Sequence, residues 1–387
     1  MELPKNCNII FITLDGFRKD KLELCPYLQS KSKQSVLFDN MITVAPYTLA
    51  SHHSMFTGMY PSMTGVDAYY NMFKFKKNKL NTLSELLQKS GYFTCSDAIS
   101  EIVVPTKGFS EVNIFDEKTV DFIERHTNLI KNLASKKQKF FLFLHYTEQH
   151  KKYVVDIVQR YKDKDDGDSD YYNSIKENDM KYSSYMVDLD KYVAAIYDIV
   201  KNSGIQNNTI LIFQADHGTS VGDKKGEKFY GVYVYDYTIN VFSMIDFPNN
   251  FSKHISSQCM TIDLFPTIAE IGNVSLNELN YEIQGKSLFP LIENDENQEH
   301  EAYSVTGGLY GPWPSPEKHN VFCIRYKNRK LIYNDTPSTW EFYDLKNDPK
   351  EMNNIYEDNN ENIKFLKAKL LKHFFKYKIK TKLTSNI

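Results

Sequence analysis

The chain has 387 residues, of which 41% are hydrophobic and 25% charged, and a formal net charge of −2. This length allows one large domain with a smaller appendage, or two domains, and the ordinary globular composition excludes a largely disordered chain. Because nucleic-acid binding depends on an excess of Lys and Arg, the balanced charge excludes nucleic acid as the expected partner.

The cysteines and the apolar runs indicate the compartment. The five cysteines are odd in number and scattered without a CxxC pair, which is typical of reduced thiols. No run approaches the roughly 20 apolar residues that cross a bilayer, and no signal-peptide pattern precedes the first apolar run at Asn8. We therefore expect a cytoplasmic protein with no membrane span, and we make no prediction of its oligomeric state.

The first predicted strand, over 8–16, is an almost continuous apolar run that ends at Asp15. The segment over 45–61 then places Thr48 ahead of two adjacent histidines. Thr is a favoured helix N-cap, and its hydroxyl can also serve as an enzyme nucleophile. The segment alone does not decide between the two roles.

A helical pattern over 80–91 ends in Gly and is followed by a second apolar run, over 139–150, which carries His145 and His150. The next segment, 153–185, is charged and rich in Tyr with little apolar periodicity. It predicts an exposed insertion close to the site, either a surface loop or a substrate lid.

A second helical pattern, over 185–204, precedes a third apolar run over 209–218, which carries Asp216 and His217 at its end. Apolar strands that alternate with helices predict an α/β fold, whose central sheet is mixed but mostly parallel and is flanked by helices. In such sheets ligands bind beyond the carboxyl ends of the strands, so the polar residues that end the three runs are expected to meet there.

The last part of the chain predicts a separate, smaller unit. An acidic linker is expected at 294–299, followed by antiparallel strands within 320–349 and a closing helix over 359–377. We therefore expect a catalytic domain over 1–293, which includes the charged insertion, and a C-terminal α+β subdomain over 294–387.

The residues at the predicted sheet edge suit a metal-dependent enzyme. Asp15, Asp216 and His217 together could hold one divalent ion. If the Thr48 hydroxyl completes the shell, the ion would acidify it and convert a weak nucleophile into a strong one.

Four segments carry a family resemblance, and they occur in the family's order. They are LDGFRKD, TLASHHSMFTGMYPSMTGV, FLHYTEQHKKY and ADHGTSVGD. They resemble the first metal motif, the nucleophile segment, the substrate-site His segment and the second metal motif of the alkaline phosphatase superfamily, in its sulfatase-like branch. The resemblance extends over nearly the whole chain and implies an alkaline phosphatase-like fold with a smaller C-terminal subdomain.

The nucleophile segment departs from the sulfatase pattern at two positions. Counting back from Thr57-Gly58, Thr48 stands where sulfatases carry the Cys or Ser that becomes formylglycine, and Thr cannot be converted. The segment instead resembles members that use Thr directly, among them phosphodiesterases, phosphonate monoester hydrolases and phosphoethanolamine transferases. His52, preceded by Ser51, replaces the motif's Arg and removes a fixed cation.

The metal set and the leaving-group acid also differ from the family pattern. Gly16 follows Asp15 where sulfatases commonly carry a second Asp. The resemblance therefore implies a metal site with fewer oxygen ligands, made of Asp, Asp, His and Thr. Such a site suits Zn²⁺ or Mn²⁺ better than Ca²⁺. Tyr230 occupies the position where the family often has His or Lys, and Lys225 and Lys228 lie close to it in the sequence.

These residues predict a metal-dependent phosphoester hydrolase, acting on a small or glycan-linked phosphodiester or phosphonate ester. Thr48 would attack phosphorus and form a phospho-Thr intermediate, while other side chains bind the non-bridging oxygens or protonate the leaving group. The expected metal ligands are Asp15, Thr48, Asp216 and His217. The expected catalytic residues are Thr48, His150, Lys228 and His52, and the expected substrate-binding residues are His145, Ser51 and Tyr230.

Three alternatives stay open at this point. They are a transferase that passes the phosphoryl group to a sugar or lipid alcohol, a sulfatase that works without formylglycine, and a catalytically inactive binding protein. A second metal site is not identified from the sequence, in which His254 and His319 are the unassigned histidines.

Overall fold

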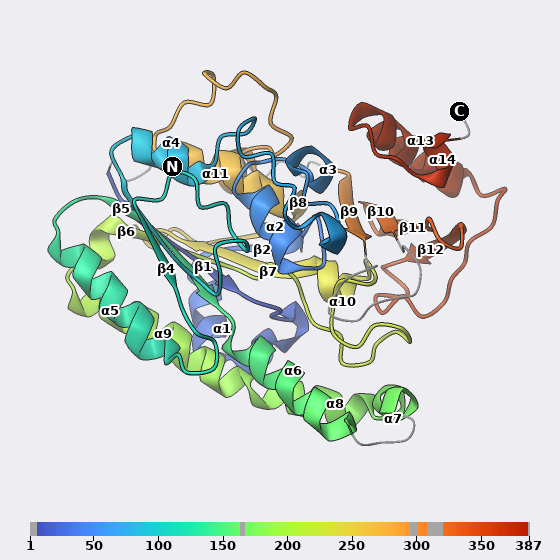
Figure 1. Ribbon diagram of the computed structural model, residues 1–387, viewed down its shortest axis with the longest axis horizontal. Coiled ribbons are helices and arrows are strands. Elements are labelled where there is room, and N and C mark those ends of the chain that lie inside the picture. Colours follow the sequence, from blue (N-terminus) through green and yellow to red (C-terminus); the bar gives the residue numbers. More distant parts are fainter. Residues whose placement is uncertain (1–5, 163–166, 295–299, 308–319, 386–387) are drawn as a thin grey trace.

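The computed structural model describes residues 6–162, 167–294, 300–307 and 320–385. Two sheets organise them, one of eight strands and one of four (Figure 1). The large sheet runs in the order β4 (Glu111–Ile114), β3 (Phe93–Ala98), β5 (Phe140–Tyr146), β1 (Asn8–Leu14), β6 (Thr209–Gln214), β7 (Asn240–Asp246), β2 (Val36–Ile42) and β8 (Lys253–Met260).

Only β7 among these described strands runs antiparallel to its neighbours, so the expected mixed, mostly parallel sheet is confirmed. The three apolar runs of the sequence are β5, β1 and β6, side by side at its centre. Their registers coincide, because Thr13 pairs with both His145 and Gln214. The residues that follow the three strands therefore leave the sheet at the same level.

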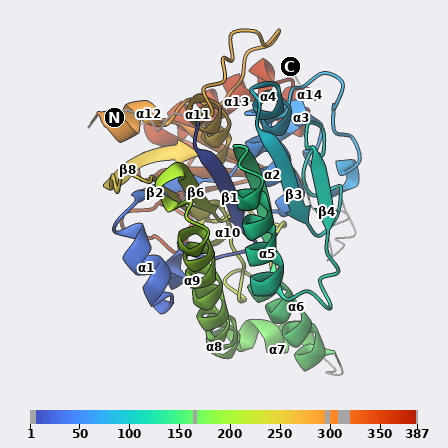
Figure 2. The same cartoon turned by 90° about the vertical axis from the view of Figure 1, so that its left-hand side faces the viewer.

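Helices cover both faces of the large sheet (Figures 1 and 2). One face carries α1 (Pro26–Ser32), α5 (Phe122–Ser135) and α9 (Met186–Asn202). The other carries α2 (Thr48–Met55), α4 (Leu83–Lys89) and α11 (Leu264–Ile271). The shorter elements are η1 (Lys19–Leu24), α3 (Pro61–Thr64), η2 (Tyr69–Asn71), η3 (Gln206–Asn208), α10 (Asp236–Ile239), η4 (Thr261–Asp263) and α12 (Phe289–Glu293).

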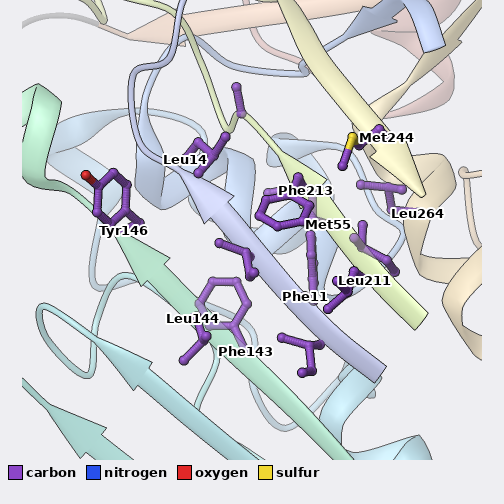
Figure 3. Close-up of a cluster of buried hydrophobic side chains, with 14 of the residues drawn as sticks. Phe11, Leu14, Met55, Phe143, Leu144, Tyr146, Leu211, Phe213, Met244 and Leu264 are labelled. Carbon is purple, nitrogen blue, oxygen red and sulfur yellow. The ribbon is translucent and has the colours of Figure 1, made fainter. Parts of the chain in front are cut away.

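The core under α2 fixes where this helix begins. Phe11 of β1 lies 5.6 Å from Phe143 of β5 and 6.1 Å from Phe56, measured between ring centroids. Figure 3 shows Met55, near the end of α2, among the same buried side chains. Burial of such aromatic and Met side chains contributes about 1.5–3 kcal/mol each. These contacts anchor the C-terminal end of α2 on the sheet, so that its first residue, Thr48, lies beyond the strand ends.

The predicted exposed insertion over 153–185 is helical in the part that the structure describes. Its helices are α6 (Glu148–Tyr161), α7 (Gly167–Asn173) and α8 (Ile175–Ser184). The expected irregular loop is not found, because Tyr153, Tyr161 and Tyr182 are buried in helical segments. A role as a substrate lid stays a prediction. Tyrosines form the inward face of these helices, and among so many charged neighbours they do not produce a clear apolar period.

The smaller sheet confirms the expected antiparallel strands near the C-terminus. Its strands run in the order β12 (Thr339–Asp344), β11 (Arg329–Asn334), β10 (Asn320–Tyr326) and β9 (Ala302–Gly307). Two helices follow, α13 (Glu361–Lys376) and α14 (Lys382–Ser385), and α13 is the expected closing helix. Residues 295–299 of the predicted linker lie outside the described residues, and the boundary at 293/294 stays a prediction.

Each of the five cysteines lies in the described ranges, buried and free, as expected. No helix in those ranges has the length and apolar character needed to span a membrane.

His373 of α13 should make the protein sensitive to acid. Its ring stacks on Tyr303 at 3.9 Å, and burial, helped by the charge of Lys376, lowers its pKa to about 3. As the pH falls below about 6.5, the unfolded chain takes up the proton first, and stability is lost at on the order of 1 kcal/mol per pH unit. In urea unfolding, the loss between pH 7 and pH 5 should be about 2 kcal/mol smaller in His373→Phe than in wild type.

The buried Phe374, the next residue of α13, provides the control for this experiment. Phe374→Leu removes packing but no titratable group, so it should keep the wild-type loss between the two pH values. An equal loss in His373→Phe and wild type would contradict the assignment.

Candidate active site

The residues that follow the three central strands meet at one edge of the large sheet. Asp15 comes directly after β1, and His145 is the last residue but one of β5. Asp216 and His217 follow β6. Thr48 reaches the same place from the start of α2. The structure therefore brings together the four residues expected to hold a metal.

Asp15 lies among three imidazoles. His145 donates a hydrogen bond from Nε2 to Oδ2 of Asp15 at 3.0 Å. The other oxygen, Oδ1, has no hydrogen-bond partner among the described residues, and it lies 3.4 Å from His217 Nε2 and 3.9 Å from His150 Nδ1. Burial alone would raise the pKa of Asp15, but the charges of these imidazoles and the hydrogen bond from His145 lower it overall.

In Asp216, too, only one of the two carboxylate oxygens accepts hydrogen bonds from the described residues. Its Oδ1 accepts hydrogen bonds from the backbone N–H groups of Gly16, at 3.1 Å, and His217, at 2.9 Å. Its Oδ2 has no hydrogen-bond partner in the described part of the chain, and lies 3.6 Å from His217 Nε2 and 3.7 Å from His52 Nε2. Burial raises the pKa of Asp216. One oxygen of each carboxylate thus points into the cluster unpaired.

The backbone sets the tautomer of His217. Nδ1 lies 2.8 Å from the carbonyl oxygen of Gly218, which can only accept, so Nδ1 carries the proton in the neutral ring. Nε2 then offers its lone pair to the cluster, where the hydroxyl of Thr48 lies 3.2 Å away. The ring of Tyr230 stacks on His217 at 4.6 Å and lies 4.8 Å from the ring of His150.

This donor set fits a divalent cation. One ligand atom from each of Asp15, Asp216 and His217 lies within 4.8 Å of the others, and all three residues are buried. Two unpaired carboxylate oxygens and an imidazole lone pair in a buried place lack a positive charge, which a cation supplies. The choice between Zn²⁺ or Mn²⁺ and Ca²⁺ stays a prediction.

Thr48 is not the helix cap. The N-cap of α2 is Tyr47, and Thr48 is the first helical residue, with its hydroxyl directed at His217. Ser51, expected to bind substrate, instead donates a hydrogen bond to the backbone oxygen of Asp216 at 2.9 Å, and its own oxygen lies 3.0 Å from that of Thr43. Its hydroxyl supports the position of a metal ligand.

The remaining predicted site residues differ in where they lie relative to the cluster of Asp15, Asp216 and His217. His150 and Tyr230 border the cluster, and His52 lies beside Asp216. For Lys228 the contact described is that of its backbone oxygen, which accepts a hydrogen bond from Tyr171. Its catalytic role stays a prediction.

The surroundings of Gly16 explain why the first metal motif has no second Asp at this position. Its φ is +65°, and an added Cβ would lie 2.6 Å from Oγ1 of Thr219 and 2.8 Å from Nδ1 of His150. Both the backbone conformation and the space therefore exclude a larger side chain. His150 fills the place beside Asp15.

Sequence reasoning missed the contacts by which residues far away in the sequence hold the loop after β1. Arg18 pairs with Asp223 at 2.8 Å and with Asp20 at 2.9 Å, so it ties this loop to the one after β6. Tyr182 of α8 donates to the backbone oxygen of Gly16 at 2.7 Å and accepts from the backbone N–H of Arg18 at 3.0 Å. The one signal available was that Arg18 and Asp223 each lie within a metal motif.

A cavity of 390 Å³ lies away from this cluster. Its lining includes Tyr60, which precedes α3, Tyr303 of β9, and His373 and Lys376 of α13. The described ligands of the cluster are not among its lining residues, so the chemistry is assigned to the strand ends.

Comparison with known proteins places these features in a family. A family model described as "Sulfatase" matches residues 7–274, and one described as "N-sulphoglucosamine sulphohydrolase, C-terminal" matches residues 226–380. An N-acetylglucosamine-6-O-sulfatase of Bacteroides thetaiotaomicron is 30% identical over 190 residues, 46% of this chain and 33% of that protein. An arylsulfatase K of Xenopus laevis is 22% identical over 451 residues, 95% of this chain and 82% of that protein.

Solved structures show the same fold. A protein in complex with its substrate D-glucosamine-2-N,6-O-disulfate has a TM-score of 0.76 and 19% identity, with 97% of this chain and 98% of that chain covered. The phosphonate monoester hydrolase of Agrobacterium radiobacter has a TM-score of 0.73 and 15% identity, with 96% of each chain covered. At these identities the likeness is one of fold.

The comparisons overturn one expectation. The prediction of a phosphodiester or phosphonate-ester hydrolase with a phospho-Thr48 intermediate is wrong, because the sequence relatives are sulfatases and the family model is that of sulfatases. The error came from Thr48: one residue that excludes formylglycine was taken to select phosphorus over sulfur, which the hydroxyl itself does not do.

Gly16→Ala should destabilise the protein more than a glycine change with the same backbone strain. Gly204 has φ +70°, and no described atom lies within 4 Å of an added Cβ, whereas Gly16 at φ +65° meets Thr219 and His150. Gly204→Ala should cost about 1–2 kcal/mol from its left-handed backbone, and Gly16→Ala a further 1–3 kcal/mol from crowding. Urea unfolding measures both, and equal losses would show that the space beside Asp15 is not filled.

Proposed function

The chain belongs to the sulfatase family, and from that we propose that it hydrolyses sulfate esters of sugars without a formylglycine. The support for sulfate is the set of named relatives, an N-acetylglucosamine-6-O-sulfatase and arylsulfatase K. The support for a sugar is the first of these names together with the disulfated glucosamine bound by a structural neighbour. The match to the first relative spans a third of that protein, so a sulfated sugar is proposed only as the class of substrate.

One observation carries the proposal for the site itself. By the resemblance of its segment, Thr48 corresponds to the residue with which sulfatases attack, and its hydroxyl lies 3.2 Å from His217 Nε2, beside the unpaired oxygens of Asp15 and Asp216. A divalent cation held by Asp15, Asp216 and His217 would acidify this hydroxyl and polarise a sulfate oxygen. Thr48 is 9% exposed, so its proton can leave to solvent before the substrate fills the site.

The chain's own residues can then carry out the displacement. Thr48 Oγ, having released its proton to solvent, attacks sulfur and forms an O–S bond, while the bond from sulfur to the sugar oxygen breaks. The free backbone N–H groups at the start of α2 would stabilise the charge on the sulfate oxygens. His150, whose Nδ1 has no hydrogen-bond partner among the residues described, is placed to protonate the departing sugar oxygen.

Release of sulfate differs from that of a formylglycine enzyme. A hydrated aldehyde has a second hydroxyl that can expel the sulfate, whereas Thr48 has one oxygen only. Water must therefore attack the sulfur of the sulfo-Thr48 ester, with His150 as the base that takes its proton, while the bond from sulfur to Thr48 Oγ breaks and Oγ takes up a proton from solvent. Two successive displacements at sulfur result, and the second has the weaker nucleophile.

The substrate panel is the first test of this proposal. We expect kcat/KM for an aryl sulfate and for N-acetylglucosamine 6-sulfate to exceed that for an aryl phosphodiester and an aryl phosphonate in the metal-loaded protein. Rates are compared at equal substrate concentration with Zn²⁺, Mn²⁺ and Ca²⁺ in turn. A preference for either phosphorus ester, or binding of the sulfated sugar without turnover, would contradict the proposal.

Substitution of Thr48 is the second test. Thr48→Ala should lower kcat on the sulfate ester by on the order of 10⁶-fold, as loss of a nucleophile does in a serine protease, and metal content should stay at the wild-type value. Thr48→Ser retains the hydroxyl and should retain activity, with its intact mass measured to show that the Ser is unmodified. In wild type, acid quench during turnover should leave the peptide with Thr48 heavier by one SO₃ unit.

Wild-type turnover in Thr48→Ala would remove Thr48 from the mechanism. Loss of metal in that variant would instead make the residue a metal ligand whose catalytic role is not separable, so metal analysis accompanies each rate.

A further inference from the structure

A second set of metal-ligating side chains lies next to the first and shares one member with it. His52, His145 and Asp216 each offer a ligand atom within 4.8 Å of the others. The side chains of His52 and Asp216 are 0% exposed and that of His145 is 1% exposed. They come from α2, from β5 and from the loop after β6, so the fold rather than a local turn brings them together.

The tautomer of His52 leaves a lone pair facing a carboxylate. Nδ1 lies 3.0 Å from the carbonyl oxygen of Val103, which can only accept, so the neutral ring has its proton on Nδ1. Nε2 then presents a lone pair toward Oδ2 of Asp216 at 3.7 Å. Neither atom has a hydrogen-bond partner among the residues that the structure describes. Two buried acceptors that face each other are unfavourable unless a positive charge lies between them.

His145 is the third member of this set. Its ring lies 5.1 Å from that of His52, nearly perpendicular to it at 78°. His145 Nε2 donates a hydrogen bond to Asp15, and His145 Nδ1 has no hydrogen-bond partner in the described ranges. A carboxylate that orients one nitrogen of a histidine ring is a common arrangement behind metal-binding imidazoles.

We propose that His52, His145 and Asp216 hold a second divalent cation beside the one assigned to Asp15, Asp216 and His217. Two imidazoles and one carboxylate suit Zn²⁺ or Mn²⁺, and three protein ligands leave a position open for an oxygen of the substrate. Asp216 would then be shared, with its unpaired oxygen directed at both ions. The second ion returns positive charge to the position where His52 stands in place of the motif's Arg.

The inference concerns metal content and does not depend on the nature of the ester. A sulfate, with several oxygens around one sulfur, can be held by two cations on different oxygens. Neither His254 nor His319 is required: His254 pairs with Asp39 at 2.7 Å on the surface, and His319 lies outside the described residues.

Metal stoichiometry of the full chain tests the proposal without an activity assay. The protein is stripped with a chelator, loaded with Zn²⁺, freed of excess ion and analysed for zinc per chain by mass spectrometry. Wild type should hold two ions, His52→Gln one, and Asp216→Asn none. After loading with Mn²⁺, the electron paramagnetic resonance spectrum should show two coupled ions in wild type and an isolated ion in His52→Gln.

His53 provides the matched control, because it is the next residue on α2, is buried, and directs Nδ1 to the carbonyl oxygen of Leu49 instead. His53→Gln should keep two ions. His145→Gln is a second variant that should reduce the count to one, and circular dichroism melting shows which variants are folded. One ion in wild type, or two ions in a folded His52→Gln protein, would overturn the proposal whatever the activity toward sulfate.

Discussion

Burial of two carboxylates at the ends of neighbouring strands is the constraint on which this molecule depends. Asp15 and Asp216 are 5% and 0% exposed, and each has one oxygen without a hydrogen bond from the described residues. A buried, unpaired carboxylate costs several kcal/mol, and two of them in one cluster repel each other. Burial, together with the charge of Asp15, raises the pKa of Asp216, whereas the imidazoles nearest Asp15 lower the pKa of that carboxyl against the effect of its own burial. A divalent cation removes the cost for both.

The rest of the fold maintains that arrangement. The registers of β1, β5 and β6 bring their last residues to one level. Contacts of Phe56 and Met55 with the core hold α2 so that Thr48 faces the carboxylates. Gly16 allows a left-handed turn against His150, and Arg18 ties this turn to the loop after β6. Large apolar contacts therefore position a small number of polar atoms, which is a common basis for precise sites.

Much of this was predictable from the sequence, for a physical reason. Continuous apolar runs that end in Asp or His indicate buried parallel strands and the polar residues at their ends, and those predictions agree with the observed sheet and with the cluster of Asp15, Asp216 and His217 at its edge. Other features depend on tertiary contacts that no local pattern contains. Examples are the tyrosines that bury the helices of the insertion, the hydroxyl of Ser51 that supports Asp216, and the approach of His52 to the same carboxylate. The choice of sulfur over phosphorus was mispredicted because one substituted residue was given more weight than the whole-chain likeness.

The central claim is that a cation balances the two buried carboxylates, and anomalous diffraction from crystals of the zinc-loaded protein tests it most directly. At the zinc absorption edge, a peak is predicted in contact with Oδ1 of Asp15, Oδ2 of Asp216 and Nε2 of His217. A map without a peak there, in which the two carboxylate oxygens bond to water or to each other through a proton, would contradict the claim.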